Sequence, residues 1–215
     1  MQNKIADLRL DYKLQSLDIQ DVSENPISQF NNWFQEALQS DLREPNAMVV
    51  ATVDKNNMPN ARVVLLKGVS GAGFIFFTNF ESKKGQELSE NSKAALVFNW
   101  LELERQIRIQ GTVEKISEED SVAYFQSRPK GSQIGAWVSP QSQVIENRSI
   151  LEKTQRELEA KFVNEAILPK PSNWGGYRVV PQTIEFWQGR SSRLHDRIFY
   201  ILQEDGSWKI ERLAP

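Results

Sequence analysis

The stretch ARVVLLKGVSGAGFIFFTNF, residues 61–80, contains two runs of strand-forming residues with a glycine-rich turn between them. Branched and aromatic side chains favour strands, and the glycines within 70–73 favour a reversal of the chain. A further apolar run, AMVVATVD (47–54), ends at the turn-forming residues KNNMPN (55–60). The region therefore predicts successive strands that pair antiparallel.

Helices and further strands flank this region. The segment 25–42 offers Asn25 as an N-cap and Pro26 as the first helical residue. Its apolar stripe consists of Phe30, Trp33, Phe34, Ala37 and Leu38. We expect further helices at 83–91, 117–128 and 147–162, and further strands at 94–101, 105–116, 175–189, 196–203 and 208–215. About seven strands at this spacing predict an α+β fold with an antiparallel barrel and peripheral helices, as one domain over 25–215 after a mobile arm over 1–24.

The composition excludes several classes of function. A chain of 215 residues that is 40% hydrophobic can bury a core, and its net charge of −2 provides no general attraction for nucleic acid or an anionic membrane. The absence of cysteine and the single histidine exclude disulfides, thiolate nucleophiles and multi-histidine metal sites. No apolar run approaches the roughly 18 to 20 residues of a membrane span, and the start lacks a signal-peptide pattern, so we expect a cytoplasmic protein. Redox chemistry would then need an organic cofactor.

Two cations lie at the ends of the segment RVVLLK. Arg62 and Lys67 are five residues apart, so in a regular strand their side chains point to opposite faces. One ion-pairing surface therefore cannot hold both. The alternative is that both reach water from the ends of a buried strand.

Two lysines stand where a helix start already concentrates positive charge. Lys83 and Lys84 follow Ser82, the expected N-cap. An anion at this helix start, such as a phosphate, would remove the conflict. The alternative is a pair of solvated lysines.

The end of the segment 117–128 combines three groups that bind phosphate. Tyr124 and Arg128 are four residues apart on one helix face, and a turn at Pro129 brings Ser132 back towards them. A phenol, a guanidinium and a hydroxyl could converge on one phosphate. Alternatively, Arg128 bonds the last carbonyls of the helix.

The segment RLHDR (193–197) is the densest cluster of cations. If it is extended, Arg193, His195 and Arg197 share one face. Such neighbours lower the pKa of His195 and favour a neutral ring that can hydrogen-bond a ligand, although a structural role is the alternative. The large aromatic side chains expected in the core or at an interface are Trp137, Trp174 and Trp187.

Taken in order, these segments resemble the pyridoxine (pyridoxamine) 5'-phosphate oxidase family, FMN enzymes of vitamin B6 metabolism. The motifs are LRLDY (8–12), ARVVLLKG (61–68), FFTNFESKKGQEL (76–88), FNWLELERQIRIQGTVEKI (98–116), YFQSRPKGSQIGAWVSPQS (124–142) and WGGYRVVPQTIEFWQGRSSRLHDRIFY (174–200). The resemblance covers nearly the whole chain. It implies a split-barrel homodimer with FMN at the subunit interface and a second phosphate pocket for the substrate.

The resemblance also implies roles for individual residues. The implied FMN contacts are Arg62, Val63, Val64, Leu65, Leu66, Lys67, Phe77, Thr78, Lys83, Lys84, Gln106, Gln141, Ser142, Trp187 and Arg197. The implied substrate contacts are Arg9, Tyr12, Lys67, Tyr124, Arg128, Ser132, Arg193 and His195. Arg193 and His195 would be the catalytic pair that holds the pyridine ring, and the segment with Arg9 and Tyr12 would close over the substrate. No metal is implied.

The implied reaction oxidises pyridoxamine or pyridoxine 5'-phosphate at C4', with hydride passing to flavin N5. Dioxygen then reoxidises the flavin, which gives pyridoxal 5'-phosphate and hydrogen peroxide. The family commonly has Tyr where this chain has Phe77 and Arg where it has Lys83, so a hydroxyl and a bidentate fork are lost. The alternatives are another split-barrel flavin oxidoreductase and a non-catalytic protein that binds flavin or pyridoxal phosphate.

Overall fold

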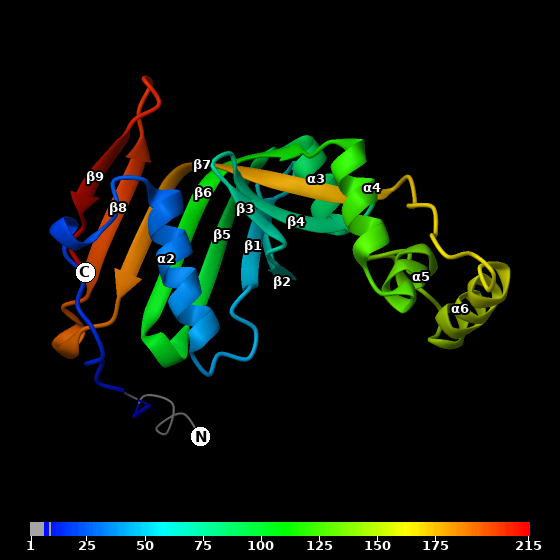
Figure 1. Cartoon of the computed structure of the whole chain (residues 1–215), viewed down its shortest axis with the longest axis horizontal. Coiled ribbons are helices and arrows are strands. Elements are labelled where there is room, and N and C mark those ends of the chain that lie inside the picture. The colour runs from blue at the N-terminus through cyan, green and yellow to red at the C-terminus, as the bar shows by residue number, and fades with distance from the viewer. Residues whose placement is uncertain (1–6, 9) are drawn as a thin grey trace. The chain divides into compact units, whose positions relative to one another are not determined.

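The computed structural model describes residues 7, 8 and 10–215 of the chain (Figure 1). The helices are η1 (Ile19–Asp21), α2 (Pro26–Gln39), α3 (Lys83–Glu90), η2 (Leu101–Leu103), α4 (Glu118–Ser127), α5 (Lys130–Val138), α6 (Ser149–Lys161) and η3 (Ser191–Arg193). The strands are β1 (Ala47–Val53), β2 (Pro59–Leu65), β3 (Gly68–Ser70), β4 (Gly73–Asn79), β5 (Lys93–Trp100), β6 (Arg105–Lys115), β7 (Trp174–Gln188), β8 (Asp196–Leu202) and β9 (Trp208–Arg212). Among these residues, no helix combines the length and apolar character that crossing a bilayer requires.

The strands form one sheet. Its order is β2-β1-β5-β6-β7-β4-β3, with β8 beside β7 and β9 beside β8. The pairs β3–β4, β4–β7, β7–β8 and β8–β9 are antiparallel. The predicted α+β class with an antiparallel sheet and peripheral helices is confirmed.

Packing divides the chain into two compact units. The first, here called the terminal unit, comprises Met1–Val50, Ala95–Gly111 and Pro181–Pro215, and the second, the central unit, comprises Ala51–Ala94 and Thr112–Val180. The expectation of a single domain over 25–215 after a mobile arm over 1–24 stays a prediction.

Helix α2 of the terminal unit begins as its sequence predicts. The Asn25 side chain accepts from the backbone N–H of Ile27, and Pro26 is the first helical residue. Three members of the predicted stripe, Phe30, Trp33 and Ala37, are buried, and Phe34 is half-buried. Leu38 was wrongly included: it is 52% exposed, because it lies one residue, about 100° of helix rotation, beyond Ala37.

In the central unit the segment RVVLLK is not one buried strand. β2 ends at Leu65, and Lys67 lies between β2 and β3, where its backbone N–H donates to the O of Ile75 in β4 (2.8 Å). Val63 is 66% exposed. The segment from Arg62 to Lys67 is therefore not one regular strand, and the predicted alternation of faces cannot be carried as far as Lys67.

A helix, α5, follows Pro129, where a turn was predicted. Pro129 is the N-cap of α5, so Ser132 lies in the first turn of a helix. Gly131 and Gly135 weaken the helical signal of this segment. The buried Ile134 shows that packing against the core compensates for that weak propensity.

Candidate functional site

A cleft of about 470 Å³ in the central unit brings many of the predicted site residues together. It receives residues from β2, β4, α3, α4 and α5. Its lining consists of Val63, Val64, Leu65, Lys67, Phe77, Thr78, Lys84, Tyr124, Arg128, Pro129, Ser132, Gln141 and Trp174. Of these, Pro129 and Trp174 were not among the predicted site residues.

The three residues predicted to bind the substrate phosphate together, Tyr124, Arg128 and Ser132, all line this cleft. Tyr124 lies on α4, Arg128 is the extended C-cap of that helix, and Ser132 follows on α5. Nη1 of Arg128 is buried without a hydrogen-bond partner among the described residues. It is the backbone N–H of Arg128 that donates to Phe125 O (3.2 Å) at the helix end. The side chain therefore offers a buried, charged donor to a ligand in the cleft.

Lys84 gives the same cleft a second buried cation. It lies in the first turn of α3, which Ser82 caps by accepting from Gly85 N, and it is 9% exposed. Its Nζ donates to Thr78 Oγ1 (3.1 Å) and Gln141 Oε1 (3.0 Å), which are both neutral. Burial, together with the charge of Arg62, lowers the pKa of Lys84. An anion at this helix start would offset both effects.

Arg62 does not line the cleft. Its Nη2 lies 3.0 Å from Glu87 Oε2, and its Nη1 donates to Thr52 Oγ1 (2.5 Å). Glu87 is 1% exposed, and hydrogen bonds from Thr52, Asn60 and Arg62 lower its pKa although burial opposes them. Glu87 was not among the predicted site residues, and its one signal in the sequence is its position four residues after Lys83 on α3.

Three further predicted FMN residues of the central unit also lie outside the cleft: Leu66, Lys83 and Ser142. Lys83 is exposed, and its Nζ lies 3.5 Å from Glu87 and 3.9 Å from Asp54. Leu66 is buried. Ser142 is exposed and has a left-handed backbone (φ 71°) beside Gln141.

The terminal unit contains a second cleft, of about 530 Å³, that collects the predicted ring-binding residues. Its lining is Leu8, Leu10, Asp11, Tyr12, Arg190, Ser192, Arg193 and His195. The segment 193–197 is not extended throughout, so the condition for a shared face of Arg193, His195 and Arg197 is not met. Ser192 and Arg193 have left-handed backbones (φ 58° and 61°), and β8 begins only at Asp196.

Two tilted aromatic rings and one backbone N–H group contact the His195 ring. Its ring centroid lies 4.5 Å from Trp187 and 5.9 Å from Tyr12. The backbone N–H of Arg190 donates to His195 Nδ1 (3.1 Å), so a neutral ring carries its proton on Nε2. Burial, and next the charge of Arg193, lowers the pKa of His195, as the sequence predicts. The residue can therefore donate from Nε2 while it remains uncharged.

An NMR titration tests this protonation state without ambiguity, because the sequence has one histidine. We expect its ring C–H resonances to titrate with a midpoint below the ordinary value of 6.5. In Arg193→Ala the midpoint should rise towards that value, since one repelling charge is removed. A midpoint at or above 6.5 in the unaltered protein would contradict the assignment.

The remaining predicted residues of the terminal unit fall in two places. Gln106 and Trp187 line a further cleft of about 350 Å³, together with Tyr12. Arg197 is bound to the buried Glu185 through Nε (2.7 Å) and Nη2 (3.1 Å), so it does not share a bare cationic face with His195. Arg9 lies outside the described residues.

The described part of the N-terminal segment is attached to the terminal unit. Glu104 Oε2 accepts from the backbone N–H groups of Lys13 (2.9 Å) and Leu14 (3.0 Å). The Tyr12 ring packs on Gly189, where a Cβ atom would lie 2.8 Å from it. Neither partner was predicted, because both lie far along the chain from the segment they hold.

Two family models match the chain. Residues 34–162 match the model described as pyridoxamine 5'-phosphate oxidase, and residues 174–215 match the pyridoxine 5'-phosphate oxidase C-terminal dimerisation region. The pyridoxine/pyridoxamine 5'-phosphate oxidase of Trichormus variabilis is 56% identical over 215 residues, 100% of both chains. That of Paraburkholderia phymatum is 56% identical over 211 residues, 98% of this chain and 99% of its own.

Solved structures share the fold. PhzG from Burkholderia lata 383, in complex with tetrahydrophenazine-1-carboxylic acid, is 30% identical with a TM-score of 0.88, over 96% of this chain and 100% of its own. A pyridoxamine 5'-phosphate oxidase-related, FMN-binding protein from Nostoc punctiforme has a TM-score of 0.70 at 18% identity, over 86% of this chain and 97% of its own. The second likeness bears on the fold alone.

Proposed function

The chain belongs to the pyridoxamine 5'-phosphate oxidase family, and we propose that it oxidises pyridoxamine or pyridoxine 5'-phosphate to pyridoxal 5'-phosphate in the cytoplasm. Membership makes it a flavin oxidoreductase with a small-molecule substrate. FMN is the proposed flavin, and when bound it supplies the acceptor for the two electrons removed at C4'. Dioxygen is the proposed final acceptor, with hydrogen peroxide as product.

The observation that carries the proposal is the buried, unpartnered Nη1 of Arg128 in the cleft of the central unit. A buried charged donor without a partner is costly, and a phosphate oxygen would satisfy it. Tyr124 and Ser132 line the same cleft and add hydroxyl donors, and Lys67 adds a second charge. This set suits a substrate that carries a phosphate.

The donors of the central unit also suit FMN. Lys84 has two neutral oxygen partners in the described part of the chain, so an anion near its Nζ is electrostatically favourable. We assign the FMN phosphate to Arg62, Lys83 and Lys84. The other predicted FMN residues, from the chain or from its partner, hold the ring system and ribityl chain. The C-terminal region 174–215 is the family's dimerisation region, so the active form is a homodimer, with FMN proposed at its interface.

Within the proposed homodimer, we assign the pyridine ring of the substrate to Arg193 and His195, from the same subunit as the phosphate cleft or from its partner. A neutral His195 that donates from Nε2 can orient a ring oxygen or nitrogen without adding charge. Arg193 is exposed in its cleft and can lay its planar guanidinium on the ring. Both residues orient the substrate, and Tyr12, which packs on His195, can cover it.

Purified protein should be yellow and dimeric, with about one FMN per chain. The physical reason is the positive charge of Arg62, Lys83 and Lys84, of which the buried carboxylate of Glu87 offsets a part. Absorbance after denaturation and light scattering measure the two quantities. A colourless monomer that ignores added FMN would refute the assignment.

Anaerobic reduction tests the function itself. Adding pyridoxamine 5'-phosphate to the FMN-loaded protein without oxygen should bleach the visible flavin absorbance, and admitting air should restore it with release of hydrogen peroxide. A protein that binds FMN but is not bleached would be a non-catalytic binding protein. Bleaching by other reductants but not by this amine or pyridoxine 5'-phosphate would indicate another split-barrel oxidoreductase.

A further inference from the structure

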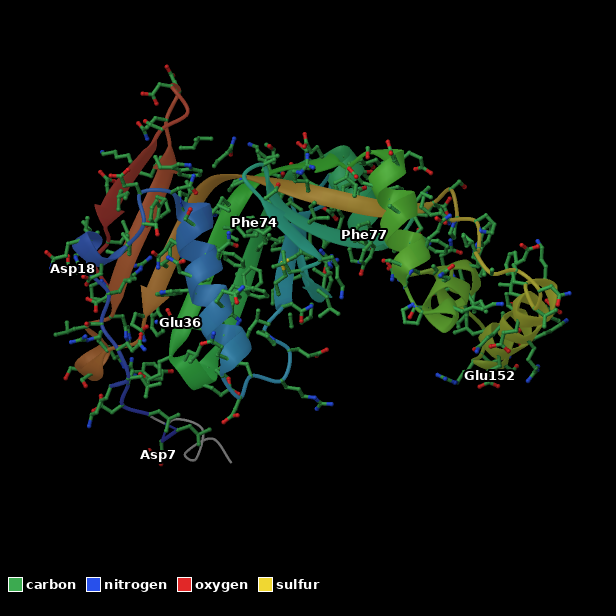
Figure 2. All side chains as sticks on the ribbon, viewed as in Figure 1. Asp7, Asp18, Glu36, Phe74, Phe77 and Glu152 are labelled. Atoms are coloured by element: carbon green, nitrogen blue, oxygen red, sulfur yellow. The ribbon has the colours of Figure 1, made fainter. Side chains whose placement is uncertain are left out.

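Three aromatic rings of the central unit lie nearly parallel in the wall of its cleft. The centroids of Phe77, labelled in Figure 2, and Tyr124 are 3.9 Å apart with planes at 21°. Phe77 and Trp174 are 5.2 Å apart at 14°, and Tyr124 and Trp174 are 6.2 Å apart at 7°. All three side chains line the cleft.

The guanidinium of Arg128 lies on the same group of rings. Its Cζ is 4.8 Å from the centroid of Trp174, within the range of a cation–π contact. The indole attracts the cation without occupying any of its N–H donors. The buried Nη1 therefore stays available to a ligand, since no described residue accepts from it.

Packing in the hydrophobic core holds the Trp174 side chain in place. It is 7% exposed and belongs to a buried cluster with Phe125, Ile134, Phe162 and Leu168. The register of β4 and β7 sets Trp174 opposite Asn79 and Phe77 opposite Gly176. A Cβ atom on Gly176 would lie 2.9 Å from the Phe77 ring, so glycine there leaves room for the ring.

We propose that Trp174 is a positioning residue for the substrate phosphate. Its indole face holds the Arg128 guanidinium, and Phe77 stacks on the Tyr124 ring, so two phosphate-binding side chains are oriented before the ligand arrives. The inference deepens the proposed function and rests on it. An aliphatic residue would fill the same core volume, but it would remove the nearer aromatic face and leave the guanidinium only the more distant ring of Phe125, whose centroid is 5.8 Å from Cζ.

The test is the preference of the FMN-loaded protein for pyridoxal 5'-phosphate over pyridoxal, measured as a ratio of dissociation constants. In Trp174→Leu this preference should fall about 3- to 30-fold, the range expected for one lost cation–π contact. Trp174→Phe keeps an aromatic face with a weaker quadrupole and should show a smaller fall. In an Arg128→Ala background, Trp174→Phe should have no further effect on the ratio.

Trp137→Leu is the matched control, because Trp137 is also a tryptophan of the central unit but lines a different cleft and donates to Pro169 O (2.9 Å). It should leave the preference unchanged. If Trp174→Leu lowers the melting temperature but keeps the preference, Trp174 is a core residue only, and the inference is overturned. If that variant does not fold, an unchanged preference in Trp174→Phe overturns it equally. Should the unaltered protein show no preference for the phosphorylated ligand, the proposed function itself fails.

Discussion

Arg193→Ala should lower turnover of pyridoxamine 5'-phosphate about 100-fold while flavin content stays normal. Orientation of a bound reactant can contribute a factor of this size, and loss of the guanidinium removes a group assigned to the substrate ring rather than to the cofactor. Arg193 is exposed and does not take part in the core, so its removal should not disturb folding. Steady-state kinetics on FMN-saturated protein, with flavin content measured separately, provide the comparison.

Three variants sharpen this result. Arg193→Lys keeps the charge but loses the planar fork, so it should recover a part of the turnover. His195→Ala should lose turnover in the same way, again with normal flavin content. Arg148→Ala, which removes an arginine side chain that is 86% exposed at the N-cap of α6, should match the unaltered enzyme. If Arg193→Ala instead lost its flavin and regained full turnover on adding FMN, Arg193 would belong to the cofactor site.

Arg128→Ala should weaken binding of pyridoxamine 5'-phosphate about 10- to 150-fold with little change in kcat. Charge-assisted hydrogen bonds are worth about 1.5 to 3 kcal/mol, and the Arg128 guanidinium acts on the phosphate, away from the reacting carbon. Flavin content should stay normal, because the FMN phosphate is assigned to other cations. The values of kcat and KM, together with titration by pyridoxal 5'-phosphate, measure the loss.

The unphosphorylated substrate is the internal control for Arg128. Pyridoxamine has no group for the guanidinium, so its kcat/KM should hardly change in Arg128→Ala. Equal losses for both substrates would mean that Arg128 is a structural residue at the end of α4. The Arg148→Ala variant again reports any general effect of removing an arginine.

The helix starts show how much of the fold could be predicted from sequence. Asn25 and Ser82 each accept from a backbone N–H two or three residues ahead, as the sequence predicts. A cap is formed by residues that are neighbours in the chain, so its chemistry is visible in a short window. Most strands were also predicted, since their apolar runs end at turn-forming residues, but the run 61–69 divides between β2 and β3.

The candidate site shows where such reasoning stops. The segment 193–197 has an alternating pattern, but the left-handed Ser192 and Arg193 end that alternation before β8 begins. Partners were missed wherever they lie far along the chain: Glu185 binds Arg197, and Glu104 binds the backbone of the N-terminal segment. A local sequence pattern does not show how close residues that are far apart in the chain lie in the folded protein.

The class of fold, the places of the capped helices and, through ordered motifs, the residues to consider for two phosphates and a flavin could all be inferred from the amino-acid order. Which of these residues meet is visible only in the folded chain: Arg128 lies on Trp174, whereas Arg62 is held by Glu87. Propensity, capping and alternation depend on neighbours a few residues apart, so they can be read along the chain. Burial and pairing depend on sheet register and on chain reversals that bring distant residues together, and these are fixed only when the whole core packs.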